Sequence, residues 1–391
     1  MRIYLVLLLL AMSKSVSAQS WQQLTGLPSN LNYKNISFLN DANGVISSDQ
    51  GLFLTSDYGN TWDTIYYNIE DNITDVQFLN DSTILFAGIN SVSYGFFAKS
   101  TDLGNNWVST DISANQPDVK LVFTSIDEGH LLSIDQILNT TDGGSTWTNG
   151  TFSNTWSFLA GDMFFTSPST GYIVGYYNAV MYKTIDNGNT WNMMTGMGAG
   201  VDVHFPSSQT GYSCDASNNI LKTEDAGNNW TEIITGFDEL TKLNSVFSPT
   251  EDACYSVGEN GVIIRTTDGG SSWQDENSGT TENLNSVACT GSYCYVTGNS
   301  GVVLRTNNIL SIVEPLTDLI SIHPNPVDNE LIIDAGGLGE YQLTIYSSSG
   351  EKVMTCNSPQ TIIDVSTLDQ GLYIIQIDHA DKQITHKFVK K

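Results

Sequence analysis

The sequence has few charged residues, and most of them are acidic. Only 15% of the 391 residues are charged, with 42 Asp and Glu against 15 Lys and Arg, so the formal net charge is −27. Because nucleic acids and anionic membrane surfaces attract Lys and Arg, this balance argues against both as partners. It is typical of a soluble extracellular protein, and binding of a specific cationic ligand is the less favoured explanation.

Cysteine is also scarce, and no segment after the N-terminus is apolar for long enough to cross a bilayer. Five cysteines are too few for a disulfide scaffold. Cys289 and Cys294 flank a short turn, and we predict a disulfide across it. Cys214 and Cys254 are expected to be buried as small apolar residues, and the pairing of Cys356 stays open. No His/Cys cluster has zinc spacing, so neither a metal nor a cofactor is expected.

The first residues predict export. Arg2, the apolar run from Ile3 to Met12 and the small residues Val16-Ser17-Ala18 are typical of a signal peptide over residues 1–18.

A short motif, Ser/Thr-x-Asp-x-Gly-x-x-Trp, recurs six times and decays in a seventh copy at Asn308. Successive copies are 39 to 45 residues apart. This period predicts a repeat architecture of about four short strands per unit. The motif residues are Asp57, Asp102, Asp142, Asp186, Asp225 and Asp268, with Trp62, Trp107, Trp147, Trp191, Trp230 and Trp273.

Each motif predicts a turn. The Asp is expected to accept hydrogen bonds from backbone N–H groups of its own hairpin, and the Gly supplies a backbone angle that side chains disfavour. The Trp begins the next strand and is expected to pack between neighbouring sheets. None of the aspartates fits a calcium loop, so we interpret them as structural.

These residues resemble the Asp-box of sialidase-like and sortilin-like β-propellers, also known as the BNR repeat. The wider repeat, clearest at residues 243–273 and 284–308, runs Leu-Asn-Ser-Val, then an aromatic residue followed by Val-Gly, then Gly-x-Ile-x-Arg-Thr, and is similar to the photosystem II assembly-factor-like family. The resemblance implies an all-β chain with a seven-bladed β-propeller over residues 19–311. A motif-less strand, Trp21–Gly26, would complete the last blade, which lacks its own fourth strand, and so leave no free edge.

After a linker at residues 312–319, the pattern of residues 320–391 changes to alternating strands, which predicts a small immunoglobulin-like β-sandwich. Pro324-Asn325-Pro326, the strand Leu343–Tyr346, the segment Leu368–Tyr373 and the basic tail together resemble the type A sorting domain of the Bacteroidota type IX secretion system. The resemblance implies cargo of that machinery, secreted or held at the outer cell surface. A permanent accessory sandwich that binds sugar or protein is the alternative.

The loops opposite the motif turns carry aromatic residues that could stack on sugars or anchor a peptide. The candidates are Tyr66, Tyr67, Tyr94, Trp156, Tyr176 and Tyr177. The sequence therefore favours a non-enzymatic binding protein whose loop face recognises an unidentified protein or glycan.

Catalytic residues are harder to find. Sialidases hold their substrate with three arginines, and after the signal peptide this chain has two, Arg265 and Arg305, at equivalent repeat positions. The alternative function is a glycoside hydrolase with two carboxylates about 5–10 Å apart at the channel mouth. Asp162, Asp202 and Asp215 are the candidates outside the motifs. His130 and His204 lie in repeat strands, and we interpret His130 as replacing a tyrosine of other repeats.

Overall fold

The computed structural model describes residues 21–307 and 321–391. Short gaps fall at 93, 116–118, 134–135, 154–159, 176–180, 195–199, 216–218 and 236–241 in the first range. Those in the second range are at 324, 335–341, 348–351, 358–361 and 380–381. The predicted signal peptide lies outside the described residues. The chain divides into two compact units, Met1–Asn308 and Ile309–Lys391.

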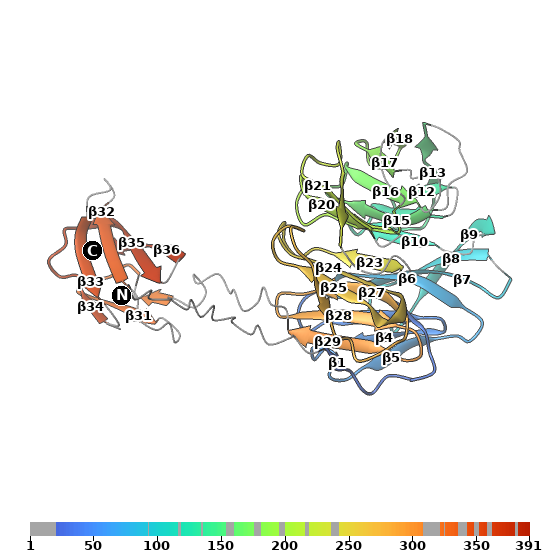
Figure 1. Ribbon diagram of the computed structural model, residues 1–391, viewed down its shortest axis with the longest axis horizontal. Coiled ribbons are helices and arrows are strands. Elements are labelled where there is room, and N and C mark those ends of the chain that lie inside the picture. The colour runs from blue at the N-terminus through green and yellow to red at the C-terminus, as the bar shows by residue number, and fades with distance from the viewer. Residues whose placement is uncertain are drawn as a thin grey trace, which may run out of the picture. The chain divides into compact units, whose positions relative to one another are not determined.

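The N-terminal unit consists of seven small sheets in chain order, which confirms the predicted all-β class (Figure 1). Among the described residues the only helical segment is a 3-10 turn, Glu259–Gly261. Sheet 1 contains β2 (Tyr33–Phe38), β3 (Gly44–Ser48), β4 (Gly51–Thr55) and β5 (Asp63–Tyr67). Sheet 2 contains β6 (Asn72–Asn80), β7 (Thr83–Ile89), β8 (Tyr94–Ser100) and β9 (Val108–Asn115). Sheet 3 contains β10 (Lys120–Phe123), β11 (Gly129–Leu132), β12 (Ile137–Thr140) and β13 (Thr148–Asn149).

The remaining four sheets follow the same antiparallel order. Sheet 4 contains β15 (Ala160–Phe165), β16 (Gly171–Gly175), β17 (Met181–Thr184) and β18 (Thr190–Met194), with β14 (Thr151–Phe152) added in parallel to β18. Sheet 5 contains β19 (Asp202–His204), β20 (Gly211–Cys214), β21 (Asn219–Thr223) and β22 (Thr231–Ile234). Sheet 6 contains β23 (Leu243–Phe247), β24 (Cys254–Gly258), β25 (Ile263–Thr266) and β26 (Gln274–Glu276). Sheet 7 contains β27 (Leu284–Cys289), β28 (Tyr293–Gly298), β29 (Val303–Asn307) and the N-terminal strand β1 (Gln22–Gln23).

Strand β1 joins the two ends of the N-terminal unit. Gln22 pairs with Arg305 and Gln23 with Leu304, and Leu24 N donates to Val303 O at 2.8 Å (Figure 1). This is the pairing that the sequence predicts for the segment beginning at Trp21. It covers the edge of β29, which would otherwise present unpaired backbone groups.

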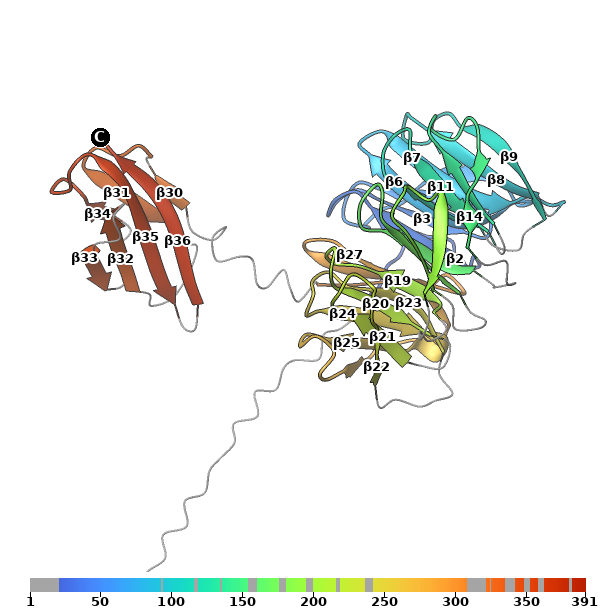
Figure 2. The same ribbon diagram turned by 90° about the horizontal axis from the view of Figure 1, so that it is seen from above.

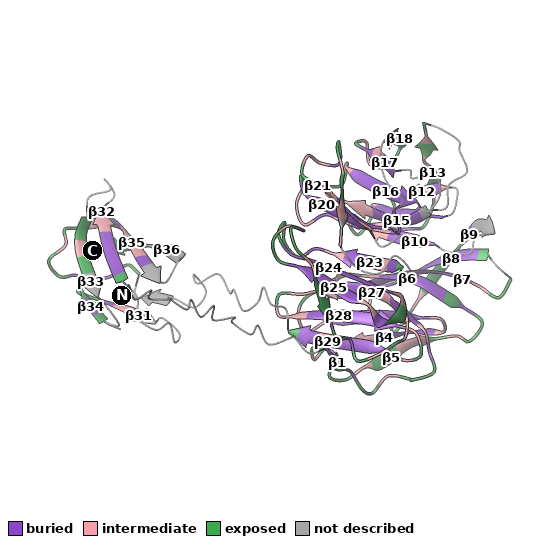
Figure 3. Cartoon of the chain, in the orientation of Figure 1, coloured by how far each residue is buried: buried purple, intermediate pink, exposed green. Residues whose placement is uncertain are grey.

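The sheets pack against one another in succession. The first strands β2, β6, β10, β15, β19, β23 and β27 contact each other in that order, and β27 in turn contacts β2. Figure 2 shows sheets 5 and 6 side by side in this series. The buried residues concentrate in the second and third strands of the sheets; every residue of β3, β7 and β16 is buried (Figure 3). One such cluster joins Val45 and Leu52 of sheet 1 to Ile73 and Phe86 of sheet 2.

The six motif turns share one hydrogen-bond pattern. In the turn of Asp142, the backbone N–H of Thr146 donates to Oδ1 at 2.9 Å, and its hydroxyl donates to Oδ2 at 2.7 Å. Thr140 donates to Oδ1 at 2.8 Å and accepts the N–H of Gly144. Gly144 has φ +89°, and a Cβ there would collide with the ring of Phe97. Each aspartate therefore caps its own hairpin, with equivalent bonds at Asp57, Asp102, Asp186, Asp225 and Asp268.

The motif tryptophans pack between sheets. Trp191 is fully buried, and Trp62 joins a cluster that contains Tyr295 of sheet 7 and Phe53 of sheet 1. Trp107, Trp147, Trp230 and Trp273 are partly buried against other clusters of this kind.

The cysteines of the N-terminal unit fall into two groups. Cys289 and Cys294, opposite one another in sheet 7, form a disulfide, whereas Cys214 and Cys254 are free and buried.

The C-terminal unit consists of two packed sheets. One contains β30 (Ser321–His323), β31 (Glu330–Asp334) and β34 (Ile362–Asp364). The other contains β33 (Lys352–Asn357), β32 (Gln342–Ser347), β35 (Gly371–His379) and β36 (Lys382–Lys390). Their facing side chains form one core that includes Leu331, Ile363, Ile345 and Ile375.

Asn325 of the predicted sorting motif holds the last strand of this unit. Its side chain donates to Lys387 O at 3.1 Å and accepts the N–H of Val389 at 2.9 Å. The motif and the basic tail therefore form one structural element.

Replacing Trp21 tests the importance of β1. Trp21 is only 8% exposed and packs edge-on against Tyr255, with ring centroids 6.2 Å apart. Trp21→Ala should lower the free energy of unfolding by about 3–5 kcal/mol, because it removes a buried aromatic side chain. Chemical denaturation followed by circular dichroism measures the change. Gln22→Ala, on the exposed side of the same strand, should change it by less than about 0.5 kcal/mol. Equal effects of the two variants would contradict a closing role for β1.

The low pKa values of the motif aspartates predict that the protein loses stability in acid. Hydrogen bonds from Thr146 and Ser272 hold the pKa of Asp142 and Asp268 at about 2, below the ordinary 3.8. A depressed folded-state pKa stabilises the protein above the unfolded pKa, and this contribution disappears as the pH falls through the folded pKa. The unfolding temperature should therefore decrease between about pH 4 and pH 2. The double variant Asp142→Asn, Asp268→Asn should have a shallower pH dependence, and an unchanged slope would refute the assignment.

Candidate functional site

Each sheet of the N-terminal unit places one polar side chain at an equivalent position of its first strand, just before a buried apolar residue. These seven residues, called here the inner polar ring, are Asn35, Asp75, Lys120, Asp162, Asp202, Ser245 and Ser286. Since the first strands contact one another in series, the ring brings together groups that are far apart in the sequence.

β-Bulges direct additional side chains to the same region. In sheets 1, 2, 4, 6 and 7 the pairing of the first two strands shifts register at the ring residue, so that two residues oppose one. A bulge re-aims the side chains on the bulged strand. Asn244 and Asn285 at such bulges donate to Leu284 O at 2.8 Å and to Tyr33 O at 2.7 Å, each in the next sheet.

The ring residues connect neighbouring sheets by hydrogen bonds. Asp75 Oδ2 accepts the N–H of Leu121 at 2.8 Å, and Asp202 Oδ2 accepts the N–H of Val246 at 2.8 Å. Ser245 Oγ accepts the N–H of Val287 at 3.2 Å. The same kind of hydrogen bond between ring residues also joins the first and last sheets.

At that junction Ser286 Oγ donates to Asn35 Oδ1 at 3.1 Å, and Asn35 Nδ2 donates to Asp75. A hydrogen bond to a charged acceptor is stronger than a neutral one. The ring therefore stabilises the contacts between sheets where their first strands meet.

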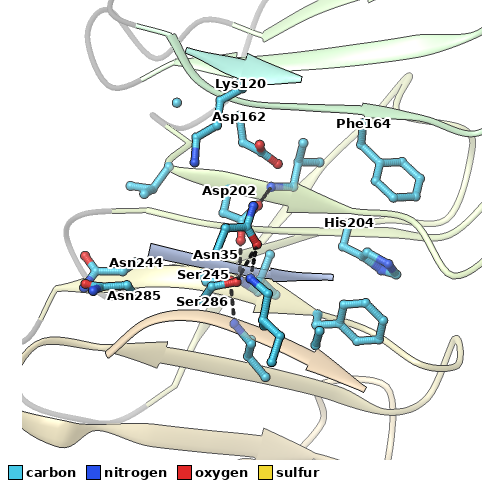
Figure 4. Close-up of a pocket in the computed structure, with 18 of the residues that line it drawn as sticks. Asn35, Lys120, Asp162, Phe164, Asp202, His204, Asn244, Ser245, Asn285 and Ser286 are labelled. Atoms are coloured by element: carbon cyan, nitrogen blue, oxygen red, sulfur yellow. Dashed lines mark hydrogen bonds between the residues drawn. The ribbon is translucent and has the colours of Figure 1, made fainter. Parts of the chain in front are cut away.

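Six of the seven ring residues line a cavity of about 210 Å³ (Figure 4). Its other polar walls are Lys34, Asn244, Asn285 and His204, and Phe164 and Phe247 supply its aromatic surface. The cavity combines carboxyl, ammonium and amide groups, so it is suited to a small polar group and not to an extended apolar ligand.

The carboxyl groups of Asp162 and Asp202 lie near each other and near Lys120 (Figure 4). Burial and the charge of Asp202 raise the pKa of Asp162 well above its ordinary value. Burial also raises the pKa of Asp75, against the opposing effect of Lys120. The raised pKa favours the protonated form of Asp162. Asp202 also accepts the N–H of Val203 at 2.8 Å, so both of its oxygens accept backbone N–H groups.

His204 is held as a neutral hydrogen-bond acceptor. Burial lowers its pKa to about 4, and its Nδ1 accepts the N–H of Ser248 at 3.3 Å. Its ring lies 4.2 Å from that of Phe247, measured between centroids. It therefore contributes packing and shape to the cavity.

The structure brings together two of the three carboxylates that the sequence nominates for hydrolysis, Asp162 and Asp202 (Figure 4). Asp215 bonds within its own turn, to Asn219 N at 2.8 Å and Asn219 Nδ2 at 3.2 Å.

The other nominated residues have structural partners. Arg265 forms a buried ion pair with Glu276 at 2.8 Å, and Arg305 donates to Tyr58 O at 2.6 Å. His130 is buried, bonds Asn139 Oδ1 at 2.8 Å and stacks on Phe165. The part of the chain that the structure describes contains no group of His, Cys, Asp and Glu arranged to bind a metal ion.

Three of the six nominated aromatic residues are described. Tyr67 and Tyr94 are 59% and 49% exposed, whereas Tyr66 is half-buried and donates its hydroxyl to Asp71 Oδ2 at 2.6 Å. Trp156, Tyr176 and Tyr177 lie outside the described residues.

Sequence reasoning missed Asn35, Asp75, Lys120, Ser245 and Ser286 of the inner polar ring. A signal for them was available, because the recurring Leu-Asn-Ser-Val of sheets 6 and 7 aligns its Ser with Asp75 in Ile73-Thr74-Asp75-Val76. The repeat identifies the position, but only the structure shows that all seven positions meet.

Two family models match the chain. Residues 321–391 match the secretion system C-terminal sorting domain. The protein is therefore exported. Residues 197–275 match the photosynthesis system II assembly factor YCF48, a match that covers sheets 5 and 6. None of the described residues forms a helix with the length and apolar character needed to cross a membrane.

Solved structures show that the N-terminal unit has a β-propeller fold. YCF48 bound to D1 peptide is 14% identical with a TM-score of 0.61, covering 76% of this chain and 100% of the other. The WD40 β-propeller domain of Doa1 is 11% identical with a TM-score of 0.57, covering 74% and 97%. Virginiamycin B lyase from Staphylococcus aureus is 11% identical with a TM-score of 0.60, covering 74% and 98%. Comparison with curated protein sequences gave no match.

Two single substitutions separate the roles of Asp162 and Asp202. A raised folded-state pKa lowers stability as the pH rises above the ordinary value of about 4, because the folded protein must lose a proton that it holds tightly. At pH 8 the free energy of unfolding of Asp162→Asn should therefore be higher than that of the wild type. The free energy of unfolding of Asp202→Asn should be about 2 kcal/mol lower than that of the wild type, because an amide cannot accept both backbone N–H groups.

Denaturant titrations of both variants at pH 5 and pH 8 measure these differences. His204 has the opposite pH dependence, since its lowered pKa removes stability between about pH 6.5 and pH 4. The free energy of unfolding of each variant is therefore compared with that of the wild type at the same pH, because both contain His204. Equal losses in the two variants would contradict the different roles assigned to Asp162 and Asp202.

Proposed function

We propose that the protein is an exported, non-catalytic binding protein whose propeller presents its loop face to another protein. The seven sheets are its seven blades, closed by β1, and the two sheets of the C-terminal unit form an immunoglobulin-like sandwich. The C-terminal unit engages the type IX secretion machinery and directs the propeller to the cell surface or the medium.

One observation carries the choice of binding over catalysis. In the cavity, Asp202 accepts backbone N–H groups of its own strand and of the next sheet, and Asp162 lies beside it; Asp75 of the ring accepts a backbone N–H of the next sheet in the same way. Groups committed in this way hold the sheets together, which favours a structural role over attack on a glycosidic bond. The glycoside hydrolase alternative is therefore the less favoured one.

A protein ligand is favoured over a glycan. A similar solved structure, YCF48, is described as bound to a peptide. The exposed apolar residues include Tyr67, Ile69, Val92 and Tyr94, which flank two neighbouring loops. Exposed apolar residues beside rigid strands are typical of protein recognition sites.

The full chain, immobilised through a C-terminal tag, can be tested against surface and secreted proteins of the producing cells, against a glycan array and against chromogenic aryl glycosides. We expect saturable, reversible binding of a protein partner, confirmed with the purified partner by calorimetry, and no glycoside turnover. The heat-denatured chain is the control. Glycoside hydrolysis that Asp162→Asn abolishes, or the absence of any saturable protein binding, would overturn the proposal.

A further inference from the structure

A second hollow, called here the aromatic crevice, lies between sheets 1 and 2, away from the inner polar ring. Its volume is about 210 Å³. Four aromatic rings and two carboxylates line it: Tyr66, Phe86, Phe96, Trp107, Asp71 and Asp111. Three of the rings come from sheet 2 and Tyr66 comes from sheet 1, so the packing of these two sheets creates it.

The rings of the crevice meet mostly edge to face. Tyr66 and Phe86 have centroids 4.9 Å apart, and Trp107 lies 4.9 Å from Phe86 and 5.9 Å from Tyr66. Ring faces carry negative electrostatic potential and attract cations that approach within about 6 Å. A crevice walled by several such rings is therefore suited to a cationic group.

Trp107 is anchored differently from other motif tryptophans. Its Nε1 donates to Ile65 O of sheet 1 at 3.2 Å, whereas Trp62 Nε1 donates to Gly59 O of its own turn at 3.1 Å. Trp147, Trp191 and Trp230 bond in the same way as Trp62. The bond to Ile65 fixes the indole against sheet 1.

The carboxylates add negative charge to the aromatic walls. Asp71 is buried and accepts the Tyr66 hydroxyl at 2.6 Å, and Asp111 is exposed on β9. Burial and the neighbouring Asp71 raise the pKa of Tyr66 to about 12, so the phenol keeps its proton. The segments 66–72, 88–98 and 107–112 contain Glu70, Asp71 and Asp111 and no Lys, Arg or His.

Exposed apolar residues lie next to the crevice residues in the sequence. Tyr67 and Ile69, 59% and 70% exposed, lie at the end of β5 and on the connector to β6, and Val92 and Tyr94, 65% and 49% exposed, lie on the turn between β7 and β8. Asn90 Oδ1 accepts the N–H groups of Val92 at 3.2 Å and Tyr94 at 3.0 Å, so this turn is held in place.

We propose that the aromatic crevice receives the cationic side chain of an arginine or lysine from an exposed segment of a partner protein, whose apolar neighbours pack on Tyr67, Ile69, Val92 and Tyr94. This assignment rests on the proposed binding function and names the chemistry of its ligand. Charge complementarity supports it, because the segments around the crevice are acidic and an anionic or neutral group would gain nothing from them.

Blocked heptapeptides test the assignment on the full chain. The parent probe is Ala-Ala-Leu-Arg-Leu-Ala-Ala, and three others carry Lys, Gln or Glu at the central position. Isothermal titration calorimetry should show saturable binding of the Arg and Lys peptides, and at least ten-fold weaker binding of the Gln and Glu peptides. Asp111→Asn should weaken the Arg peptide about five-fold, and Tyr94→Ala should weaken the Arg and Lys peptides to a similar degree.

Asp127→Asn is the matched control, since it removes an equally exposed carboxylate on sheet 3 and should leave the affinity unchanged. Equal binding of the Gln and Arg peptides, equal effects of Asp111→Asn and Asp127→Asn, or no saturable binding of either cationic peptide would overturn the assignment.

A captured protein partner whose affinity is unaffected by Asp111→Asn and Tyr94→Ala would also overturn it, while leaving the proposed binding function intact. Loss of all protein partners would instead count against the proposed function. The same peptides and variants thus separate the two proposals.

Discussion

Each four-stranded sheet of the N-terminal unit buries its two faces only against its neighbours, and this constraint shapes everything else in the unit. A single small sheet in water cannot bury enough apolar surface to be stable. Each middle sheet packs against a neighbour on both sides. The first and last sheets pack against each other through the contact of β27 with β2. The N-terminal strand β1 then completes sheet 7. The two ends of the N-terminal unit are thereby joined by a strand pair and by the buried Trp21.

The inner polar ring follows from the same constraint. Seven first strands meet where there is little room, and their backbone N–H groups need acceptors away from bulk water. Asp75, Asp202 and Ser245 provide these acceptors from the preceding sheet. The cavity lined by the inner polar ring is therefore explained by the packing of the sheets.

Recognition of a partner is thus expected at the outer part of the blades. Tyr66 and Trp107 both line the aromatic crevice. The sequence nominates Tyr66 as a ligand-binding residue and Trp107 as a structural motif residue. Its position between two sheets lets one tryptophan serve both packing and binding. The −27 net charge, first interpreted as a means of solubility, also favours a cationic ligand at this site.

The sequence alone determined the all-β class, the repeat, the capping role of the motif aspartates and the place of β1. These are local or periodic features, since a turn such as that of Asp142 is stabilised by hydrogen bonds within seven residues. The resemblance of residues 320–391 to a sorting domain was likewise legible in short motifs. Only the tertiary structure decided that Asp162 and Asp202 lie near each other, that seven polar positions meet, and that Tyr66 faces Trp107 across two sheets. Such contacts join residues about 40 positions apart, and their distances depend on how whole sheets pack, which no local pattern encodes.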